Sequence, residues 1–186
     1  MQINMEEVEQ EKLKEYLVQC EKVFEFGCGG STVLMSGMEN IKTIHSVESD
    51  KNWVSAVKKQ VGGRVNFHFV DINTAPGLWG HPKDKSKISE WPNYSGVLSK
   101  IPDYYPDLIF VDGRFRVACA LKSLEKMNAQ SHLMVHDYGL DRNYNVIEKW
   151  FKKVDSADTL FVFTKKENID QEEINKAIKE YEYIDD

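Results

Sequence analysis

The segment that most constrains the fold is residues 23–32, VFEFGCGGST, where an apolar strand runs into a glycine turn and then a helix. Gly27 and Gly29 permit backbone angles that a Cβ would forbid, and they let a ligand approach the main chain closely. Ser31 and Thr32 stand where the first turn of a helix has unpaired N–H groups. The segment therefore predicts a strand, a turn and a helix that together leave main-chain groups open to a ligand.

An acidic residue follows this turn at an informative distance. The next expected strand, residues 41–47, ends at Glu48, and the interval from Glu25 to Glu48 is 48 − 25 = 23 residues. A ribose-binding carboxylate is expected roughly 20 residues after such a glycine turn. The two features together predict a pocket for a nucleoside-containing cofactor.

Strand-like and helix-like stretches alternate along the rest of the chain. The expected strands are residues 23–26, 41–47, 65–70, 107–111, 132–136 and 159–164, and the expected helices are residues 31–38, 50–62, 115–127, 144–151 and 171–181. A first helix carries the apolar stripe Val8, Leu13, Tyr16 and Leu17. Such alternation predicts a parallel sheet covered on both faces. A seventh strand is not evident, and residues 181–184 are its weak candidate.

We therefore expect one α/β domain over residues 1–186, a Rossmann-like doubly wound, mostly parallel sheet of six or seven strands with helices on both faces. Residues 1–20 would hold the N-terminal helix and residues 168–186 the C-terminal helix. Ligands of such sheets bind at the carboxyl ends of the strands. The polar residues at these ends are Glu25, Glu48, Asp71, Asp112, His136 and Asp137.

One long connection interrupts the alternation. Residues 73–105 contain four prolines and two tryptophans, with little periodicity. A connection of this length in a compact domain is usually functional or disordered, and its aromatic residues argue against disorder. We expect a lid or substrate loop, in which Trp79 and His81 contact the substrate.

Composition excludes several classes of partner. The net charge is −6, with scattered Lys and Arg, which argues against a nucleic-acid binder. There is no apolar run long enough to span a bilayer. The three cysteines have no metal-binding spacing and suit a reducing cytoplasm.

Several segments resemble the class I S-adenosylmethionine-dependent methyltransferases. They are VFEFGCGGST, the acidic residue in HSVESD, the Asp of FVDI and the strand in PDLIFVDGR, and the resemblance spans about residues 23–164. PDLIFVDGRFRVACAL and TAPGLWGHP look like a bacterial and viral subgroup of small Rossmann-like methyltransferases. VHDYG is similar to the end of the fifth strand in O-methyltransferases that modify sugars and small hydroxyl compounds.

The resemblance implies a role for each strand end. The methionine part of S-adenosylmethionine would be held by Glu25, Gly27, Gly29 and Gly30, and Ser31 and Thr32 would also belong to the cofactor-binding turn. Glu48 would bind both ribose hydroxyls, and Asp71 with the Ile72 backbone would face the adenine. Asp112 would lie beneath the methyl group, where a carboxylate favours a cationic sulfonium.

The acceptor side resembles the family less closely. Many metal-dependent O-methyltransferases place Asp, then Asp-Asn, at the ends of the fourth and fifth strands. Here Asp112 and Asp137 remain and the amide is missing, which puts a bound Mg²⁺ or Ca²⁺ in doubt and leaves it open. Asp112 could instead cap a helix.

The reaction expected from the resemblance is methyl transfer to a hydroxyl of a small molecule or of a sugar or glycan. Asp112, His136 and Asp137 are the candidates for the base that takes the hydroxyl proton. Arg114 and Arg116 could anchor the substrate, pair with Asp112 or Asp137, or lie on a solvated surface.

Two other classes of function stay open. A nicotinamide-dependent oxidoreductase would require G-x-G-x-x-G, and the position of the third glycine is Thr32 here. A cofactor-binding subunit without turnover would share every feature of the cofactor pocket.

Overall fold

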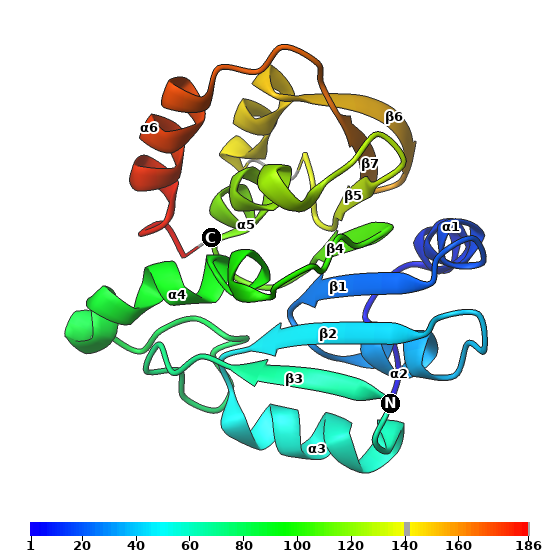
Figure 1. Ribbon diagram of the computed structural model, residues 1–186. Coiled ribbons are helices and arrows are strands. Elements are labelled where there is room, and N and C mark those ends of the chain that lie inside the picture. The colour runs from blue at the N-terminus through cyan, green and yellow to red at the C-terminus, as the bar shows by residue number, and fades with distance from the viewer. Residues whose placement is uncertain (140–141, 186) are drawn as a thin grey trace.

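The computed structural model describes residues 1–139 and 142–185. Over this part of the chain it has a seven-stranded sheet in the order β3-β2-β1-β4-β5-β7-β6 (Figure 1). The strands are β1 Lys22–Phe26, β2 Thr43–Glu48, β3 Val65–Phe69, β4 Leu108–Val111, β5 His132–Val135, β6 Phe151–Ala157 and β7 Leu160–Lys165. The first five are parallel to one another, and β7 lies antiparallel between β5 and β6.

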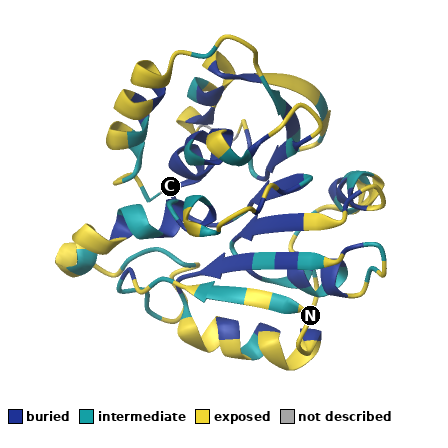
Figure 2. Cartoon of the chain, in the orientation of Figure 1, coloured by how far each residue is buried: buried dark blue, intermediate teal, exposed yellow. Residues whose placement is uncertain are grey.

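Helices cover both faces of this sheet. The α-helices are α1 Glu7–Leu17, α2 Gly30–Ser36, α3 Lys51–Val61, α4 Trp91–Ser95, α5 Arg116–Ser123 and α6 Gln171–Tyr181, and the 3-10 helices are η1 Lys85–Glu90, η2 Leu98–Lys100, η3 Leu124–Lys126 and η4 Asn143–Lys149. Because successive strand residues point to opposite faces, Val23 packs in the core under α1 and α2, while Phe24 packs in the core under α4, α5 and α6. The central strands are accordingly buried along nearly their whole length (Figure 2). The predicted Rossmann-like, mostly parallel α/β fold is confirmed.

The last third of the sheet differs from the prediction. Residues 144–151 are not an α-helix: η4 ends at Lys149, and Phe151 begins β6. The proposed seventh strand at residues 181–184 is wrong, because Tyr181 is the last residue of α6. The seventh strand is β6, which the sequence hid because this edge strand is mostly solvent-exposed and a register shift between Lys153 and Asp155 breaks its alternation.

The inward face of α1 also differs from the predicted stripe. Val8 is 54% exposed, whereas Glu9 is 1% exposed and shares the buried face with Leu13 and Leu17. These three residues are spaced by four, which places them on one side of a helix. A carboxylate therefore points into the protein from the N-terminal helix.

The connection over residues 73–105 divides into two parts. Its second part contains α4 and η2, whose Trp91, Tyr94 and Leu98 are buried in the core against α5. Its first part, residues 73–84, is a loop closed by a bridge between Thr74 and Pro82. The loop lies near the carboxyl ends of β2 and β3 (Figure 1). No helix among the described residues is long and apolar enough to cross a membrane.

Candidate functional site

The glycine turn after β1 has one crowded side and one open side. Gly27 has φ +93°, and a Cβ there would lie 2.8 Å from Gly113 Cα, so the turn packs directly on the turn after β4. A Cβ on Gly29 would have no other atom within 4 Å, so this residue faces open space. A Cβ on Gly30 would lie 2.5 Å from the Gln2 carbonyl oxygen, so the N-terminal segment forms one wall of the turn.

Glu25 is fully buried beneath this turn. Its carboxylate accepts hydrogen bonds from the hydroxyls of Ser31 and Thr32, both at 2.5 Å, and of Ser46 at 2.6 Å. Burial raises the pKa of Glu25 to about 7, and the three hydroxyls oppose that rise without cancelling it. Glu25 thus ties the start of α2 to β1 and β2, and fixes the shape of the open turn.

Glu48 lies next to the open side of the turn. Its carboxylate accepts hydrogen bonds from the backbone N–H groups of Cys28, Ser49 and Asp50, at 3.2, 2.6 and 2.9 Å. Burial raises its pKa, because these donors offset only part of the desolvation. The Ser49 hydroxyl donates to the Gly80 carbonyl oxygen at 3.2 Å, so the 73–84 loop reaches Glu48.

The end of β3 borders a cavity of about 520 Å³. Asp71 and Lys87 line this cavity and form an ion pair, and the Asn73 N–H donates to the same carboxylate at 3.0 Å. Lys87 is the main cause of the lowered pKa of Asp71. Ile72 is fully buried in the core, so its side chain does not line this cavity.

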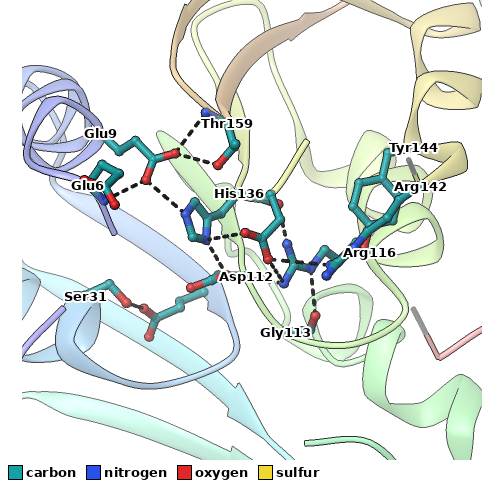
Figure 3. Close-up of polar contacts among 12 residues, drawn as sticks. Glu6, Glu9, Ser31, Asp112, Gly113, Arg116, His136, Arg142, Tyr144 and Thr159 are labelled. Atoms are coloured by element: carbon teal, nitrogen blue, oxygen red, sulfur yellow. Dashed lines mark hydrogen bonds and ion pairs between the residues drawn. The ribbon is translucent and has the colours of Figure 1, made fainter. Parts of the chain in front are cut away.

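The ends of β4 and β5 bring three titratable residues together. Asp112, His136 and Asp137 each offer a ligand atom within 4.8 Å of the others. His136 Nδ1 lies 2.8 Å from Asp112 Oδ1, and its Nε2 lies 3.2 Å from Oε2 of Glu9 on α1 (Figure 3). Burial disfavours the charged ring, but the hydrogen bond to Asp112 and the surrounding carboxylates outweigh it and raise the pKa of His136 to about 9.

Arg116 joins the two aspartates of this group. Its Nη2 atom lies 3.0 Å from Asp137 Oδ2 and 3.4 Å from Asp112 Oδ1, and its Nε donates to the Gly113 carbonyl at 3.0 Å (Figure 3). The side chain is almost fully buried, so the solvated-surface alternative is wrong for Arg116. Burial opposes the effect, but Arg116 is the main reason that the pKa of Asp137 lies below its ordinary value.

These contacts bear on the expected metal. A divalent cation bound by Asp112 and Asp137 would lie beside the Arg116 guanidinium, which already bridges the two carboxylates. A charged His136 ring would repel it as well. The residues present therefore fit an internal arginine better than Mg²⁺ or Ca²⁺, and we derive no step through a metal.

The 73–84 loop meets the site through Arg114. Arg114 is also buried, and its Nη1 contacts His81 Nε2, while His81 Nδ1 lies 3.2 Å from Asp185 near the C-terminus. Trp79 is 81% exposed and has φ +51°, so it does not pack against the pocket. The structure thus brings His81 and Arg114 together and leaves Trp79 in solvent.

Sequence reasoning missed three contributors to this group. They are Glu9 of α1, Thr159 in the turn before β7, and Arg142, whose Nη1 lies 3.5 Å from Asp137. Glu9 left one signal, a carboxylate on the apolar face of a helix. Thr159 and Arg142 left none, because each lies in a turn or loop whose position only the fold decides.

Comparison with known proteins agrees with this geometry. No family model and no curated protein matches the sequence. A solved methyltransferase-like protein from Silicibacter pomeroyi is 27% identical, with a TM-score of 0.86, over 100% of this chain and 98% of that one. The N-methyltransferase NodS from Bradyrhizobium japonicum, solved with S-adenosylhomocysteine, is 13% identical over 88% of this chain and 90% of its own, with a TM-score of 0.52.

An RNA methyltransferase from Salinibacter ruber, also with S-adenosylhomocysteine, is 16% identical over 91% of this chain and 97% of its own, with a TM-score of 0.50. At such identities NodS and the RNA methyltransferase show a common fold alone. The structural neighbours of this chain are therefore S-adenosylmethionine-dependent methyltransferases, and the chain has their class I Rossmann-like fold.

Proposed function

We propose that this chain transfers a methyl group from S-adenosylmethionine to a hydroxyl of a small molecule, with a sugar or glycan as the first candidate. The observation that carries the proposal is the open face of Gly29 next to the buried carboxylate of Glu48. A turn whose Gly29 faces open space, beside a carboxylate, suits a nucleoside with a ribose diol. The methyltransferase-like neighbour at 27% identity supports methyl transfer as the reaction.

Each part of the cofactor has candidate residues. The methionine part would lie on the turn shaped by Glu25, whose residues are Gly27, Gly29, Gly30, Ser31 and Thr32. Glu48 would accept hydrogen bonds from both ribose hydroxyls, releasing some of its backbone N–H partners. Asp71 and the Ile72 backbone would face the adenine in the cavity beside Lys87.

The cofactor supplies a methyl group on a sulfonium, and the chain supplies position and a proton acceptor. When bound, the cofactor would give its methyl carbon to the acceptor oxygen, with the sulfur as leaving group, and the hydroxyl proton would pass to a base of this chain. Holding the reacting atoms in line can lower the barrier by several kcal/mol. Asp112, His136 and Asp137 are the candidates for the base.

The acceptor would lie between Asp112, Asp137 and the 73–84 loop. Arg114 and Arg116 border this region, and His81 contacts Arg114. The exposed Trp79 has the apolar surface to stack on a sugar ring if the loop closes. We also propose that the chain belongs to the bacterial and viral subgroup of small Rossmann-like methyltransferases and that it acts in the cytoplasm.

The first experiment is a set of calorimetric titrations with S-adenosylmethionine, S-adenosylhomocysteine and NAD. We expect both adenosyl compounds to bind and NAD not to bind. Binding of NAD alone would sink the proposal in favour of an oxidoreductase.

Acceptor class is tested separately with a methyl-labelled cofactor. The protein would be incubated with pools of sugars, small phenols, amines and RNA, and label transfer would be measured. We expect label on hydroxyl compounds, and Asp112→Ala should abolish it. Label on amines or RNA would show that the acceptor is not a hydroxyl compound. Cofactor binding without any methyl transfer in cell extracts would favour a non-catalytic subunit.

A further inference from the structure

The N-terminal helix contributes a buried carboxylate to the site. Glu9 is 1% exposed, and its Oε1 accepts hydrogen bonds from the Thr159 backbone N–H at 3.0 Å and hydroxyl at 2.6 Å. Its Oε2 accepts from the Glu6 N–H at 2.9 Å and lies 3.2 Å from His136 Nε2 (Figure 3). The carboxylate of Glu9 is therefore fixed by uncharged donors from Glu6 and Thr159, and it points toward the ring of His136.

The contacts of His136 decide the protonation of its ring. Nδ1 lies 2.8 Å from Asp112 and 3.8 Å from Asp137, and Nε2 lies 3.2 Å from Glu9. A neutral imidazole donates from one nitrogen only, whereas an ionised carboxylate only accepts. Carboxylates on both nitrogens therefore require that both donate, which makes the ring an imidazolium.

The charges around the ring agree with this count. Glu9 faces it from α1, Asp112 from the end of β4 and Asp137 from the end of β5, while Arg116 from α5 contacts the two aspartates. The pKa of Glu9 is lowered, because its hydrogen bonds and the nearby His136 outweigh the effect of burial. An imidazolium cannot take a proton from an acceptor, so His136 in this state is not the base.

We propose that Glu9 is a positioning residue of the methyl-transfer site: together with Asp112 and Asp137 it holds the His136 ring as a cation, and this ring orients the Asp112 carboxylate toward the bound cofactor. The ring joins α1 to the end of β4, and the Asp112 Oδ1 atom is held by both His136 Nδ1 at 2.8 Å and Arg116 Nη2 at 3.4 Å. Only one part of this proposal rests on the proposed function, namely that Asp112 faces a bound cofactor. It leaves Asp112 and Asp137 as the candidates for the base.

The test is Glu9→Gln, which keeps the size of the side chain. The amide oxygen can still accept from Thr159, but the NH₂ takes the place of Oε2, so it would donate to Nε2 and could no longer accept from the Glu6 N–H. The change therefore favours a neutral ring that keeps its N–H toward Asp112. The matched control is Glu7→Gln, which makes the same chemical change at an exposed position of the same helix.

The first readout is ¹⁵N NMR of histidine-labelled protein over a pH series, with the His136 signals identified by their loss in His136→Gln. We expect a wild-type ring that is protonated at neutral pH and titrates near pH 9, as its pKa of about 9 implies. In Glu9→Gln the pKa should fall by about one unit or more, and Glu7→Gln should keep it. A neutral wild-type ring, or an unchanged pKa in Glu9→Gln, would overturn the proposal.

The second readout is calorimetric affinity for S-adenosylmethionine. We expect Glu9→Gln to weaken binding by about threefold or more, with Glu7→Gln near wild type. A shifted ring pKa with unchanged affinity would show that Glu9 does not position Asp112. If no variant and no wild-type protein binds the cofactor, the proposed function fails, while the NMR result still decides the contact between Glu9 and His136.

Discussion

The two halves of the sheet edge hold their carboxylates in opposite ways. At the ends of β1 and β2, Glu25 and Glu48 accept hydrogen bonds from hydroxyls and backbone N–H groups, and burial raises the pKa of both. At the end of β5, Asp137 is paired with the guanidinium of Arg116, and its pKa is lowered. Neutral donors leave part of the desolvation cost uncompensated, whereas a cation more than offsets it.

The difference suits two kinds of work. A carboxylate held by neutral donors can exchange them for ribose hydroxyls, because the donors gained resemble the donors lost. A carboxylate held by buried cations is fixed in place, because separating the charges leaves one of them desolvated and unpaired. The ends of β1 and β2 are therefore suited to binding the cofactor, and the ends of β4 and β5 to holding side chains in a fixed orientation.

The largest expected effect comes from removing the buried cation. Arg116→Met should lower the free energy of unfolding by about 3–5 kcal/mol, because it removes a buried guanidinium that pairs with the half-buried carboxylates of Asp112 and Asp137. Arg142→Met is the matched control, since Arg142 is more exposed and lies 3.5 Å from Asp137, and it should cost less than about 1 kcal/mol. Urea unfolding measures both, and equal losses would remove the contrast between buried and exposed cations.

The next effect concerns pH. Because the pKa of His136 rises from 6.5 to about 9 on folding, its contribution to stability is fully present below pH 6.5 and is lost as pH rises through about 9. The loss should be on the order of 3 kcal/mol. Chemical unfolding from pH 6.5 to 9.5 measures it. His136→Gln should flatten this part of the curve, and a wild-type protein with no alkaline loss contradicts the cationic ring.

The binding half is tested with the cofactor. Glu48→Ala should weaken S-adenosylhomocysteine binding at least about tenfold, because two charge-assisted hydrogen bonds to the ribose are lost. Asp71→Ala should weaken it by less, about threefold, because Asp71 is half-exposed and already paired with Lys87. Unchanged affinity in Glu48→Ala would remove Glu48 from the site.

The smallest expected effect is that of metal removal. If Arg116 and His136 neutralise Asp112 and Asp137, treatment with EDTA should leave stability and cofactor affinity unchanged, and titration with Mg²⁺ or Ca²⁺ should give no binding heat. Thermal unfolding and calorimetry, each with and without chelator, measure this. If EDTA lowers the affinity for the cofactor and added Mg²⁺ restores it, the site at the ends of β4 and β5 depends on a metal.

The fold was largely predictable because its signals are local. Buried parallel strands such as β4 are continuous apolar runs in the sequence. Gly27 indicates a turn because glycine is the residue that most readily adopts a positive φ. Both signals can be recognised without knowing which segments pack against them. The edge strand β6 was missed for the opposite reason: its exposed residues and broken alternation carry no burial pattern.

The sequence by itself determined the parallel sheet, the glycine turn and the polar residues that follow the strands, because each depends on periodicity or on spacing along the chain. Only the tertiary structure decided the partners of those residues. Glu9 and His136 lie 127 residues apart in sequence, and Arg116 reaches both aspartates by folding back over the start of its helix. A strand end fixes where a side chain begins, whereas its charge and orientation depend on groups that distant segments bring to it.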